Sequence, residues 1–216
     1  MNDLLLKREF EALNCIAILG GTFNPVHKGH IMLAEAVVEQ YPHIEKLYIM
    51  PNNIPAYKDS KGVISSNHRI NMLKLAMKHI EKACISDMEI VRGGNTYTID
   101  TLRQIKSYNP DISIYFVIGA DSLYNIEKWR EFEQVLSLCT IVAAKRDCDF
   151  EDIIDVSEEL MRKYPQSDIK LLSTNAVNIS SSHLRNDINK GIYDKEYLSD
   201  DVVDYIKANR LYRMDN

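Results

Sequence analysis

The 216-residue sequence has no long hydrophobic run. Its longest unbroken apolar stretch is the five residues Cys15–Leu19, whereas a helix that crosses a bilayer needs about 20. The first eight residues place charge on both sides of three leucines, so the basic start, long apolar centre and cleavage site of a signal peptide are lacking. We therefore expect neither a membrane-spanning chain nor an exported one.

Cysteine is scarce as well, and its spacing excludes two common kinds of site. The four cysteines are Cys15, Cys84, Cys139 and Cys148, and no two of them form a C-x-x-C pair. A zinc knuckle or a thioredoxin-type site therefore has no support. Three of the four begin apolar, strand-like runs, where a reduced thiol acts as a small hydrophobic side chain. This usage predicts a reducing, cytoplasmic location.

An excess of positive charge is also missing, because 31 acidic and 26 basic side chains give a net charge of −5. General nucleic-acid binding is therefore not favoured. The charge is unevenly distributed, and residues 55–82 carry six basic and two acidic side chains, a net of +4. This region suits a small polyanion such as a nucleotide, and a solvated helix face is the alternative explanation.

Apolar, β-branched runs alternate with segments of helical periodicity along almost the whole chain. The predicted strands are Cys15–Leu19, Lys46–Met50, Ile85–Val91, Ile112–Ile118, Thr140–Ala144 and Ile169–Leu172. Between two of them, Leu33, Val37 and Tyr41 recur at the spacing of one helix face. Continuous apolar strands separated by helices imply a parallel sheet covered on both faces, so we expect a doubly wound α/β fold.

No linker rich in glycine, serine or proline interrupts this alternation. The composition, with 45 % hydrophobic and 26 % charged residues, is typical of a globular chain. We therefore predict one domain spanning residues 1–216. Residues 1–14 precede the first strand as a short amphipathic extension, and Asp200–Tyr212 is predicted as a terminal helix.

The first predicted strand ends in GGTFNPVHKGH at residues 20–30, and a helix follows. In a doubly wound sheet, ligands bind at the carboxyl end of such a strand. Gly20 and Gly21 lack side chains, so backbone N–H groups there can approach phosphate oxygens closely. The helix that starts near Gly29 directs its positive end to the same place. His27 and His30 span that helix start, so both imidazoles can reach one anion.

Other phosphate loops and metal sites do not fit these residues. The Walker pattern G-x-x-x-x-G-K-[ST] is missing, and the spacing from Gly20 and Gly21 to Gly29 does not match the dinucleotide pattern G-x-G-x-x-G. Two histidines without a third ligand make a poor metal site. A glycine turn with two incidental histidines is the structural alternative.

The loop closely resembles the opening motif of bacterial nicotinate mononucleotide adenylyltransferases, within the H-x-G-H nucleotidyltransferase superfamily. Family members usually have aspartate where this chain has Asn24. Further blocks resemble the family over most of the chain and follow in the family's order. The resemblance implies a Rossmann-like nucleotidyltransferase fold with C-terminal helices, and catalytic roles for His27, His30 and Arg185.

The further blocks imply which residues bind each substrate. They are PNNIPAYK at 51–58, GNTYTIDTL at 94–102, IGADS at 118–122 and ISSSHLR at 179–185, together with Trp129 and Arg146. The resemblance implies that ATP is held by Gly20, Gly21, Thr22, Phe23, Lys58, Gly119, Asp121, Ile179, Ser180, Ser181 and Ser182. It implies that the mononucleotide is held by Tyr97, Thr98, Thr101, Trp129 and Arg146. The tryptophan would stack on the pyridine ring, and the 97–101 loop would face its carboxylate.

Each block also has a structural explanation. A lone tryptophan usually packs in a core or on a surface, and an arginine after a strand is most often a surface charge. Ser180–Ser182 suits a helix N-cap, and Asp121 suits a cap for the helix after its strand. The order and completeness of the blocks favour the functional interpretation.

The chemistry that the resemblance implies needs no protein nucleophile, and no G-x-S-x-G elbow is present. The phosphate of nicotinate mononucleotide would attack the α-phosphorus of ATP and displace pyrophosphate, which yields deamido-NAD. His27 and His30 would donate hydrogen bonds to phosphate oxygens, and Arg185 would hold the leaving phosphates. Mg²⁺ would travel with ATP, and no protein metal site is expected.

Other classes remain as alternatives. A transferase acting on phosphopantetheine, or one with a cytidylyl donor, would share H-x-G-H but should lack Tyr97–Leu102 and Trp129 together. A non-catalytic nucleotide-binding protein would tolerate loss of His27, His30 or Arg185, and an aminoacyl-tRNA synthetase fragment would carry K-M-S-K-S, which is missing. The expected partners are ATP and nicotinate mononucleotide, with no nucleic acid and no membrane. A homo-oligomer and the strength of the preference for the acid over the amide are left open.

Overall fold

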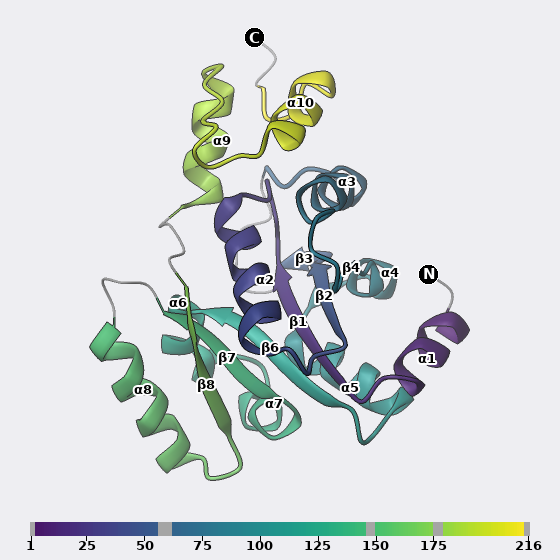
Figure 1. Cartoon of the computed structure of the whole chain (residues 1–216), viewed down its shortest axis with the longest axis vertical. Helices are drawn as coiled ribbons and strands as arrows, with labels where there is room; N and C mark the ends of the chain where they lie inside the picture. The colour runs from purple at the N-terminus through teal and green to yellow at the C-terminus, as the bar shows by residue number, and fades with distance from the viewer. Residues whose placement is uncertain (1–2, 56–61, 146–149, 175–178, 214–216) are drawn as a thin grey trace.

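A computed structural model describes residues 3–55, 62–145, 150–174 and 179–213. Its centre is a sheet of six parallel strands in the order β4-β2-β1-β6-β7-β8 (Figure 1). The strands are β1 (Cys15–Gly21), β2 (Lys46–Pro51), β4 (Ala83–Ile85), β6 (Ser113–Gly119), β7 (Thr140–Lys145) and β8 (Asp168–Ser173). A separate parallel pair joins β3 (Ile54–Pro55) to β5 (Asn95–Thr96). The predicted parallel α/β sheet is confirmed.

Helices connect the strands on both sides of this sheet. They are α1 (Asp3–Glu11), α2 (Lys28–Gln40), α3 (Ser66–Ala76), α4 (Met88–Arg92), α5 (Thr98–Tyr108), α6 (Ala120–Tyr124), α7 (Phe132–Leu138), α8 (Phe150–Lys163), α9 (Ser181–Asn189) and α10 (Asp200–Ala208). A short 3₁₀ helix, η1, covers Ile126–Lys128. In the described part of the chain, no helix has both the length and the apolar character that crossing a membrane requires.

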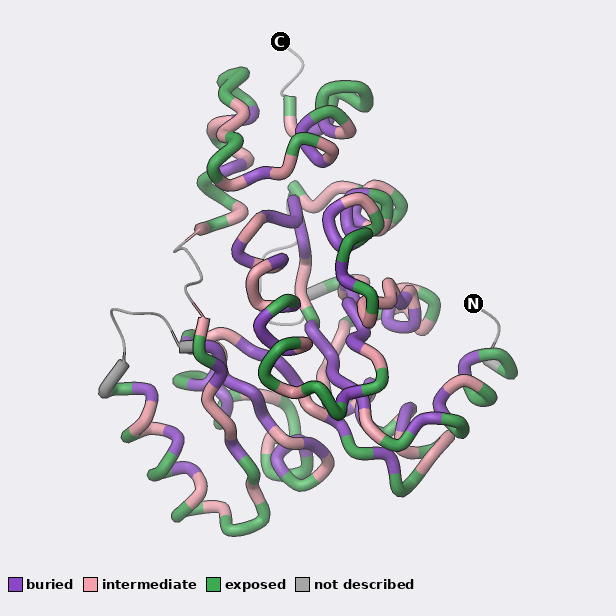
Figure 2. Tube along the Cα trace, in the orientation of Figure 1, coloured by how far each residue is buried: buried purple, intermediate pink, exposed green. Residues whose placement is uncertain are grey.

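Both faces of the sheet are buried, because its strands are nearly continuous apolar runs (Figure 2). Helices α2, α3, α9 and α10 share a core with one face, which includes Leu19 and Val117. Helices α1 and α4–α8 share a second core with the other face, which includes Ile18 and Phe116. Successive strand residues therefore enter opposite cores, and the helices lie on both sides as the doubly wound fold requires.

The strand order reverses beside β1. The chain passes from β1 to β2 and β4 on one side, and then crosses to β6, β7 and β8 on the other. Leu19 of β1 consequently pairs with Ile49 of β2 and with Val117 of β6. In open parallel sheets, ligands bind outside the carboxyl ends of the strands at such a reversal. Here those ends are Gly21 and Gly119.

Residues 1–14, predicted as an extension, contain a helix that completes the second core. Phe10 of α1 is fully buried, and its ring centroid lies 5.1 Å from that of Tyr48. Burial opposes ionisation of Glu9, but hydrogen bonds from Lys46 Nζ at 2.8 Å and Tyr48 Oη at 2.6 Å outweigh it and lower the pKa of Glu9. Polar and apolar contacts together hold α1 against the sheet.

The predicted strand Ile85–Val91 is wrong over most of its length. The strand β4 ends at Ile85, and α4 begins at Met88. Ser86 Oγ accepts a hydrogen bond from the backbone N–H of Met88 at 3.3 Å, and Gly93, with φ of +74°, follows the last residue of the helix. Polar residues at 86, 87 and 89 interrupt the apolar run, so the local side-chain bonding of Ser86 prevails over strand propensity.

The terminal helix is shorter than the predicted Asp200–Tyr212, because α10 ends at Ala208. Its inward side chains Val202, Val203 and Ile206 are buried as predicted, while Tyr205 is half-buried. Beyond the helix, Tyr212 has φ of +62°, and its hydroxyl reaches the loop that follows β1.

Replacing Phe10 by alanine tests whether α1 belongs to the core. Phe10→Ala removes a buried aromatic ring, so we expect the free energy of unfolding in urea to fall by about 3–5 kcal/mol. Leu5→Ala is the matched control, since Leu5 lies on the same helix with 54 % of its surface exposed. It should change stability by less than about 0.5 kcal/mol. Equally small losses in both variants would mean that α1 lies outside the cooperative core.

Candidate active site

The loop between β1 and α2 lies at the reversal of strand order, as the sequence predicts. Strand β1 ends at Gly21, and α2 begins at Lys28 with His27 as its N-cap residue. The backbone of His27 is extended, with φ of −142° and ψ of 170°. The amino end of α2, where a helix is electropositive, therefore lies directly behind the two histidines.

The rings of His27 and His30 are stacked, with centroids 3.7 Å apart and planes inclined by 29°. The backbone N–H of His27 donates to Nδ1 of His30 at 3.2 Å. Because Nδ1 is an acceptor, the proton of a neutral His30 ring is on Nε2. The Phe23 ring meets His30 edge-on at 4.9 Å and fixes its orientation further. The structure thus brings the two predicted histidines together.

Gly21 makes room for Phe23 rather than only for a ligand. Phe23 is buried and has φ of +50°, a left-handed conformation that few residues with large side chains adopt. A Cβ added to Gly21 would lie 3.0 Å from Cζ of the Phe23 ring, which is tighter than most real Cβ contacts, so the ring would have to shift. A Cβ on Gly20 would meet Cζ of Phe116 at an ordinary 3.5 Å. Gly21 is therefore the glycine that the loop conformation requires.

Asn24 connects the loop to two distant segments and is almost fully buried. Its Nδ2 donates to the carbonyl oxygen of Gly62 at 3.0 Å. Its Oδ1 accepts from the backbone N–H of Ile64 at 3.3 Å and from the Tyr212 hydroxyl at 3.0 Å. An amide is needed for this arrangement, because a carboxylate has no donor for the Gly62 carbonyl. These partners are 38 to 188 residues away, so no local pattern predicts them.

Arg69 is a buried cation beneath the same loop, and no motif of the sequence predicts a ligand-binding role for it. Its side chain is 2 % exposed, and one guanidinium nitrogen donates to the carbonyl oxygen of Thr22 at 3.0 Å. Burial lowers the pKa of Arg69, yet an arginine remains protonated at neutral pH. Asn52 Nδ2 donates to Thr22 Oγ1 at 3.2 Å, so Thr22 is held from two sides.

The start of α9 meets this loop, although it lies about 160 residues later. Ser180 is the N-cap residue of α9, and Ser181 Oγ donates to the carbonyl oxygen of Pro25 at 3.2 Å. Arg185 donates to the carbonyl oxygen of Asn24 at 2.8 Å and to Ser182 Oγ at 3.1 Å. Two predicted phosphate-binding blocks are therefore bonded to each other. Ile179 precedes them and is half-buried.

The carboxyl end of β6 contributes the third predicted block. Gly119 is the N-cap residue of α6, and a Cβ there would meet nothing within 4 Å. Asp121 is exposed in the first turn of that helix. Since β6 is the neighbour of β1, both residues lie at the same reversal of strand order.

Among the residues predicted to bind the mononucleotide, Tyr97, Thr98 and Thr101 lie at the start of α5, and Trp129 follows η1. Tyr97 is the N-cap residue and Thr98 the first residue of this helix. The guanidinium of Arg130 lies over the Tyr97 ring, 4.8 Å from its centroid. Trp129 is half-buried and meets Phe116 edge-on with 6.2 Å between the centroids.

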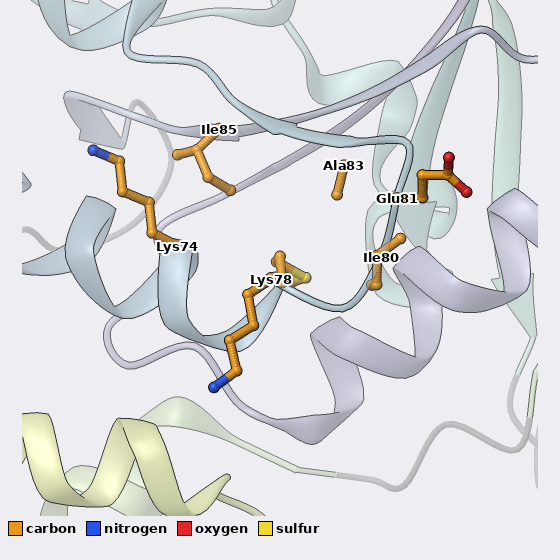
Figure 3. Close-up of a pocket in the computed structure, with 7 residues that line it drawn as sticks. Lys74, Lys78, Ile80, Glu81, Ala83 and Ile85 are labelled. Carbon is orange, nitrogen blue, oxygen red and sulfur yellow. The ribbon is translucent and has the colours of Figure 1, made fainter.

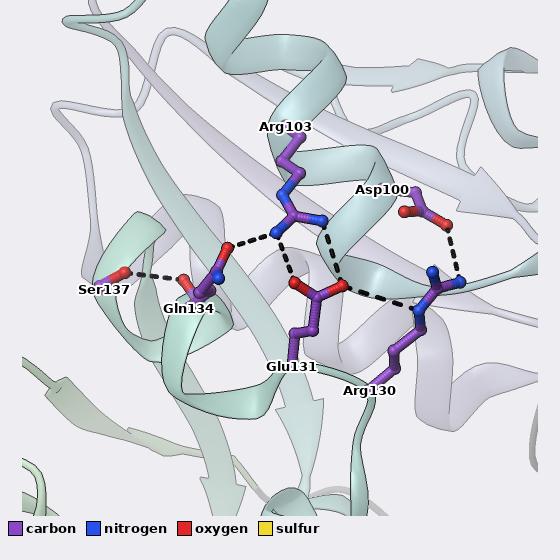
Figure 4. A network of polar contacts seen from close by, with 6 residues as sticks. All are labelled: Asp100, Arg103, Arg130, Glu131, Gln134 and Ser137. Carbon is purple, nitrogen blue, oxygen red and sulfur yellow. Dashed lines mark hydrogen bonds and ion pairs between the residues drawn. The ribbon is translucent and has the colours of Figure 1, made fainter.

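Charged side chains brace this second region, as Figure 4 shows. Arg130 lies 3.9 Å from Asp100 Oδ2 and 3.7 Å from Glu131 Oε1. Arg103 of α5 donates to the same Glu131 at 3.1 Å. These pairs connect the first turns of α5 to the segment that follows Trp129, so the two halves of the predicted acceptor site are held together.

Three of the predicted site residues do not lie on the described surface of the site. Lys58 and Arg146 lie outside the described residues. Thr101 is fully buried, and its hydroxyl donates to Glu89 Oε1 at 2.7 Å. The structure thus places this hydroxyl in the interior, away from the surface of the loop.

A pocket of about 280 Å³ lies elsewhere, between α3 and the edge strand β4 (Figure 3). Its lining includes Met77, Ile80, Ala83 and Ile85, with Lys74 and Lys78 drawn beside them. None of the predicted site residues is part of this lining. Within the ranges that the structure covers, no three His, Cys, Asp or Glu side chains are grouped as a metal ion would need.

The fold and this arrangement of loops define a nucleotide-binding transferase of the doubly wound α/β class. The family model for cytidylyltransferase-like proteins matches residues 18–187. The "probable nicotinate-nucleotide adenylyltransferase" of Lachnoclostridium phytofermentans is 40 % identical over 198 residues, covering 91 % of this chain and 98 % of that protein. The protein of the same name from Lactococcus lactis is 37 % identical over 198 residues, covering 92 % and 95 %.

A solved structure shows the same fold at lower identity. It is the nicotinic acid mononucleotide adenylyltransferase of Plasmodium falciparum in complex with NaAD, with a TM-score of 0.76, 23 % identity, and coverage of 92 % of this chain and 97 % of that one. The chain therefore belongs to the nicotinate-nucleotide adenylyltransferase family, within the cytidylyltransferase-like proteins. The resemblance of its motifs to this family is confirmed.

The two neighbouring glycines allow a matched test of the loop. Gly21→Ala forces a methyl group against the Phe23 ring, so we expect the free energy of unfolding to fall by about 1–3 kcal/mol. Gly20→Ala makes only an ordinary contact with Phe116 and should cost less than about 1 kcal/mol. Chemical unfolding of both variants measures the difference. An equal loss in the two would contradict the role of Gly21 in seating Phe23.

Proposed function

We propose that the chain transfers AMP from ATP to nicotinate mononucleotide, giving deamido-NAD and pyrophosphate in the synthesis of NAD. The observation that carries this proposal is the bonding of Arg185 to the loop of His27 and His30. It joins two helix starts, each of which supplies backbone N–H groups and polar side chains suited to phosphate. The names of the relatives support the same reaction.

ATP binds along the carboxyl ends of β1 and β6 in this proposal. Gly20, Gly21, Thr22 and Phe23 form the loop around the phosphates, and Lys58 adds a positive charge. Gly119 and Asp121 contact the nucleoside. Ile179 and the hydroxyls of Ser180–Ser182 hold the outer phosphates together with Arg185. Support comes from the contacts of Ser181 and Arg185 with Pro25 and Asn24, which place the second helix start beside the first.

The protein contributes position and positive charge, because the acceptor brings its own nucleophile. An oxygen of the mononucleotide phosphate attacks the α-phosphorus of ATP, and the bond from that phosphorus to the pyrophosphate oxygen breaks. His27 and His30 donate hydrogen bonds to the α- and β-phosphates as charge moves toward the leaving group. The Nε2–H that the contact with the His27 backbone assigns to His30 supports this role. Arg185 stabilises the pyrophosphate that departs.

Magnesium enters with ATP in this proposal, as part of the substrate. Mg²⁺ prefers oxygen ligands and is commonly held by substrate phosphates with one or two protein carboxylates. We also propose that the protein works in the cytoplasm. Support comes from Cys15, Cys84 and Cys139, which are free thiols in the structure, as a reducing compartment would keep them.

The acceptor binds between the start of α5 and Trp129. The indole offers a flat face for the pyridine ring, and backbone N–H groups at Tyr97 and Thr98 suit a carboxylate at the amino end of a helix. Arg146 pairs with the mononucleotide phosphate. Support comes from the bridge of Arg130 to Tyr97 and Asp100, which keeps the two walls of this site adjacent.

The histidines give the first test of the mechanism. His27→Ala and His30→Ala should each lower kcat by about 10²-fold or more, because each removes a donor to charge that develops in the transition state. His79→Ala is the control, since His79 pairs with Glu35 on the surface and should leave kcat unchanged. Steady-state rates and thermal unfolding are measured together. A kcat near the parent value in either active-site variant would refute its catalytic role.

The choice of acceptor tests the function itself. Pyrophosphate release is measured with ATP or CTP as donor and with nicotinate mononucleotide, nicotinamide mononucleotide or phosphopantetheine as acceptor. We expect ATP with nicotinate mononucleotide to be the preferred pair, with kcat/KM about one to two orders of magnitude above that for the amide, because the amide sets its own donors against the N–H groups. Trp129→Ala should lower kcat/KM with both pyridine acceptors and keep much of their ratio. Equal use of acid and amide by the parent would overturn the acid-specific assignment.

A further inference from the structure

Glu89 is a buried carboxylic acid for which the proposed reaction has no use. It lies in α4 and is 5 % exposed. Burial raises the pKa of Glu89, while the hydrogen bond from Thr101 and the charge of Arg92 act in the opposite direction. A carboxyl group in the interior costs free energy unless its partners are well placed, so its surroundings need an explanation.

The hydrogen bonds around Glu89 run in one direction. Arg92 can only donate, and one of its terminal nitrogens donates to Thr101 Oγ1 at 2.9 Å. The Thr101 proton is therefore directed to Glu89 Oε1, 2.7 Å away. The other terminal nitrogen of Arg92 donates to Gln104 Oε1 at 3.0 Å. A guanidinium and a carboxyl group are thus linked through one buried hydroxyl.

This link spans the segment that carries the proposed acceptor loop. Glu89 and Arg92 belong to α4, whereas Thr101 and Gln104 belong to the first two turns of α5. Between them the chain turns at Gly93 and Gly94, with φ of +74° and +67°, and then reaches Tyr97 and Thr98. The two ends of residues 93–98 are consequently fixed to each other from behind.

A second set of contacts holds the same segment from the side of β3. The backbone N–H of Asn53 donates to Thr96 Oγ1 at 3.0 Å, and Asn53 Nδ2 donates to the carbonyl oxygen of Gly94 at 3.0 Å. Arg130 also lies over the ring of Tyr97. Residues 93–98 are therefore held by contacts with α4, with Asn53 and with Arg130.

We propose that Glu89, Thr101 and Arg92 are positioning residues that hold the first N–H groups of α5 in register with the carboxylate of the acceptor, and that they set the preference for the acid over the amide. This inference rests on the proposed binding of the mononucleotide at Tyr97 and Thr98. Because the Thr101 hydroxyl is buried, it acts through the backbone of its helix rather than by touching the acceptor.

Thr101 offers a nearly isosteric test. Thr101→Val keeps the shape but removes the hydroxyl, whereas Thr101→Ser keeps the hydroxyl. In Thr101→Val we expect KM for nicotinate mononucleotide to rise about tenfold, KM for ATP to stay within twofold, and the acid-to-amide ratio of kcat/KM to fall about tenfold, as the loss of one buried hydrogen bond allows. Thr101→Ser should restore all three values. Ser107→Ala is the control, because Ser107 is an exposed hydroxyl on the same helix.

Hydrogen exchange of the unliganded protein separates this inference from the proposed function. Amides of residues 95–98 should exchange at least about tenfold faster in Thr101→Val and remain unchanged in Thr101→Ser and Ser107→Ala. Arg92→Gln should act in the same direction and serves if the valine variant does not fold, since Arg92 is half-exposed.

Each result has a defined meaning. Unchanged exchange at residues 95–98, or equal rises in KM for ATP and for the mononucleotide, would overturn the positioning role. If the parent does not use nicotinate mononucleotide, the proposed function fails and with it the claim about acid preference. The exchange rates would still decide whether the buried link holds the loop.

Discussion

The hydrogen bond from Arg185 to the carbonyl oxygen of Asn24 joins segments that are 161 residues apart in the sequence. One segment is the loop after β1, and the other begins the C-terminal helices. The planar guanidinium also donates to Ser182, so its orientation is fixed by two bonds in one plane. Together with the bond from Ser181 Oγ to the carbonyl oxygen of Pro25, this contact makes one surface of the two helix starts. The remaining features of the proposed ATP site depend on their being one surface.

Two arginines beside the loop after β1 donate to neutral carbonyl groups. Arg69 donates to the carbonyl oxygen of Thr22, and Arg185 donates to that of Asn24. A carbonyl group orients a guanidinium without cancelling its charge, whereas a carboxylate would do both. Asn24 is also neutral. Its amide bonds to Gly62 and Tyr212, and it adds no negative charge to the loop as an aspartate would. These bonds to neutral groups leave the positive charge of Arg185 beside the loop after β1, in a chain whose net charge is −5.

The sequence predicts those features of the fold that residues close together in the chain determine. Parallel strands buried on both faces leave continuous apolar runs, and the loop at residues 20–30 contains all of its own signals. The strand predicted at residues 85–91 is wrong beyond Ile85, because the Ser86 side chain accepts a bond from the Met88 N–H and α4 begins there. Glu89 lies in α4, within the segment predicted as a strand, so its contacts with α5 could not be predicted from the sequence. The contacts of Asn24 and Arg69 join distant segments, so their roles emerge only when the fold brings the partners together.

The docking of α1 has a consequence for the order in which the chain can fold during synthesis. Asn109 Nδ2 donates to the carbonyl oxygens of Phe10 and Leu13, at separations of 99 and 96 residues. Translation at roughly 5–20 residues per second means that the first helix waits on the order of 5–20 s for this partner. During that interval Phe10 has no complete core to enter, and the apolar side of this amphipathic helix is open to other contacts. Helix α1 therefore cannot complete these contacts until Asn109 has been synthesised, with β6 directly behind it.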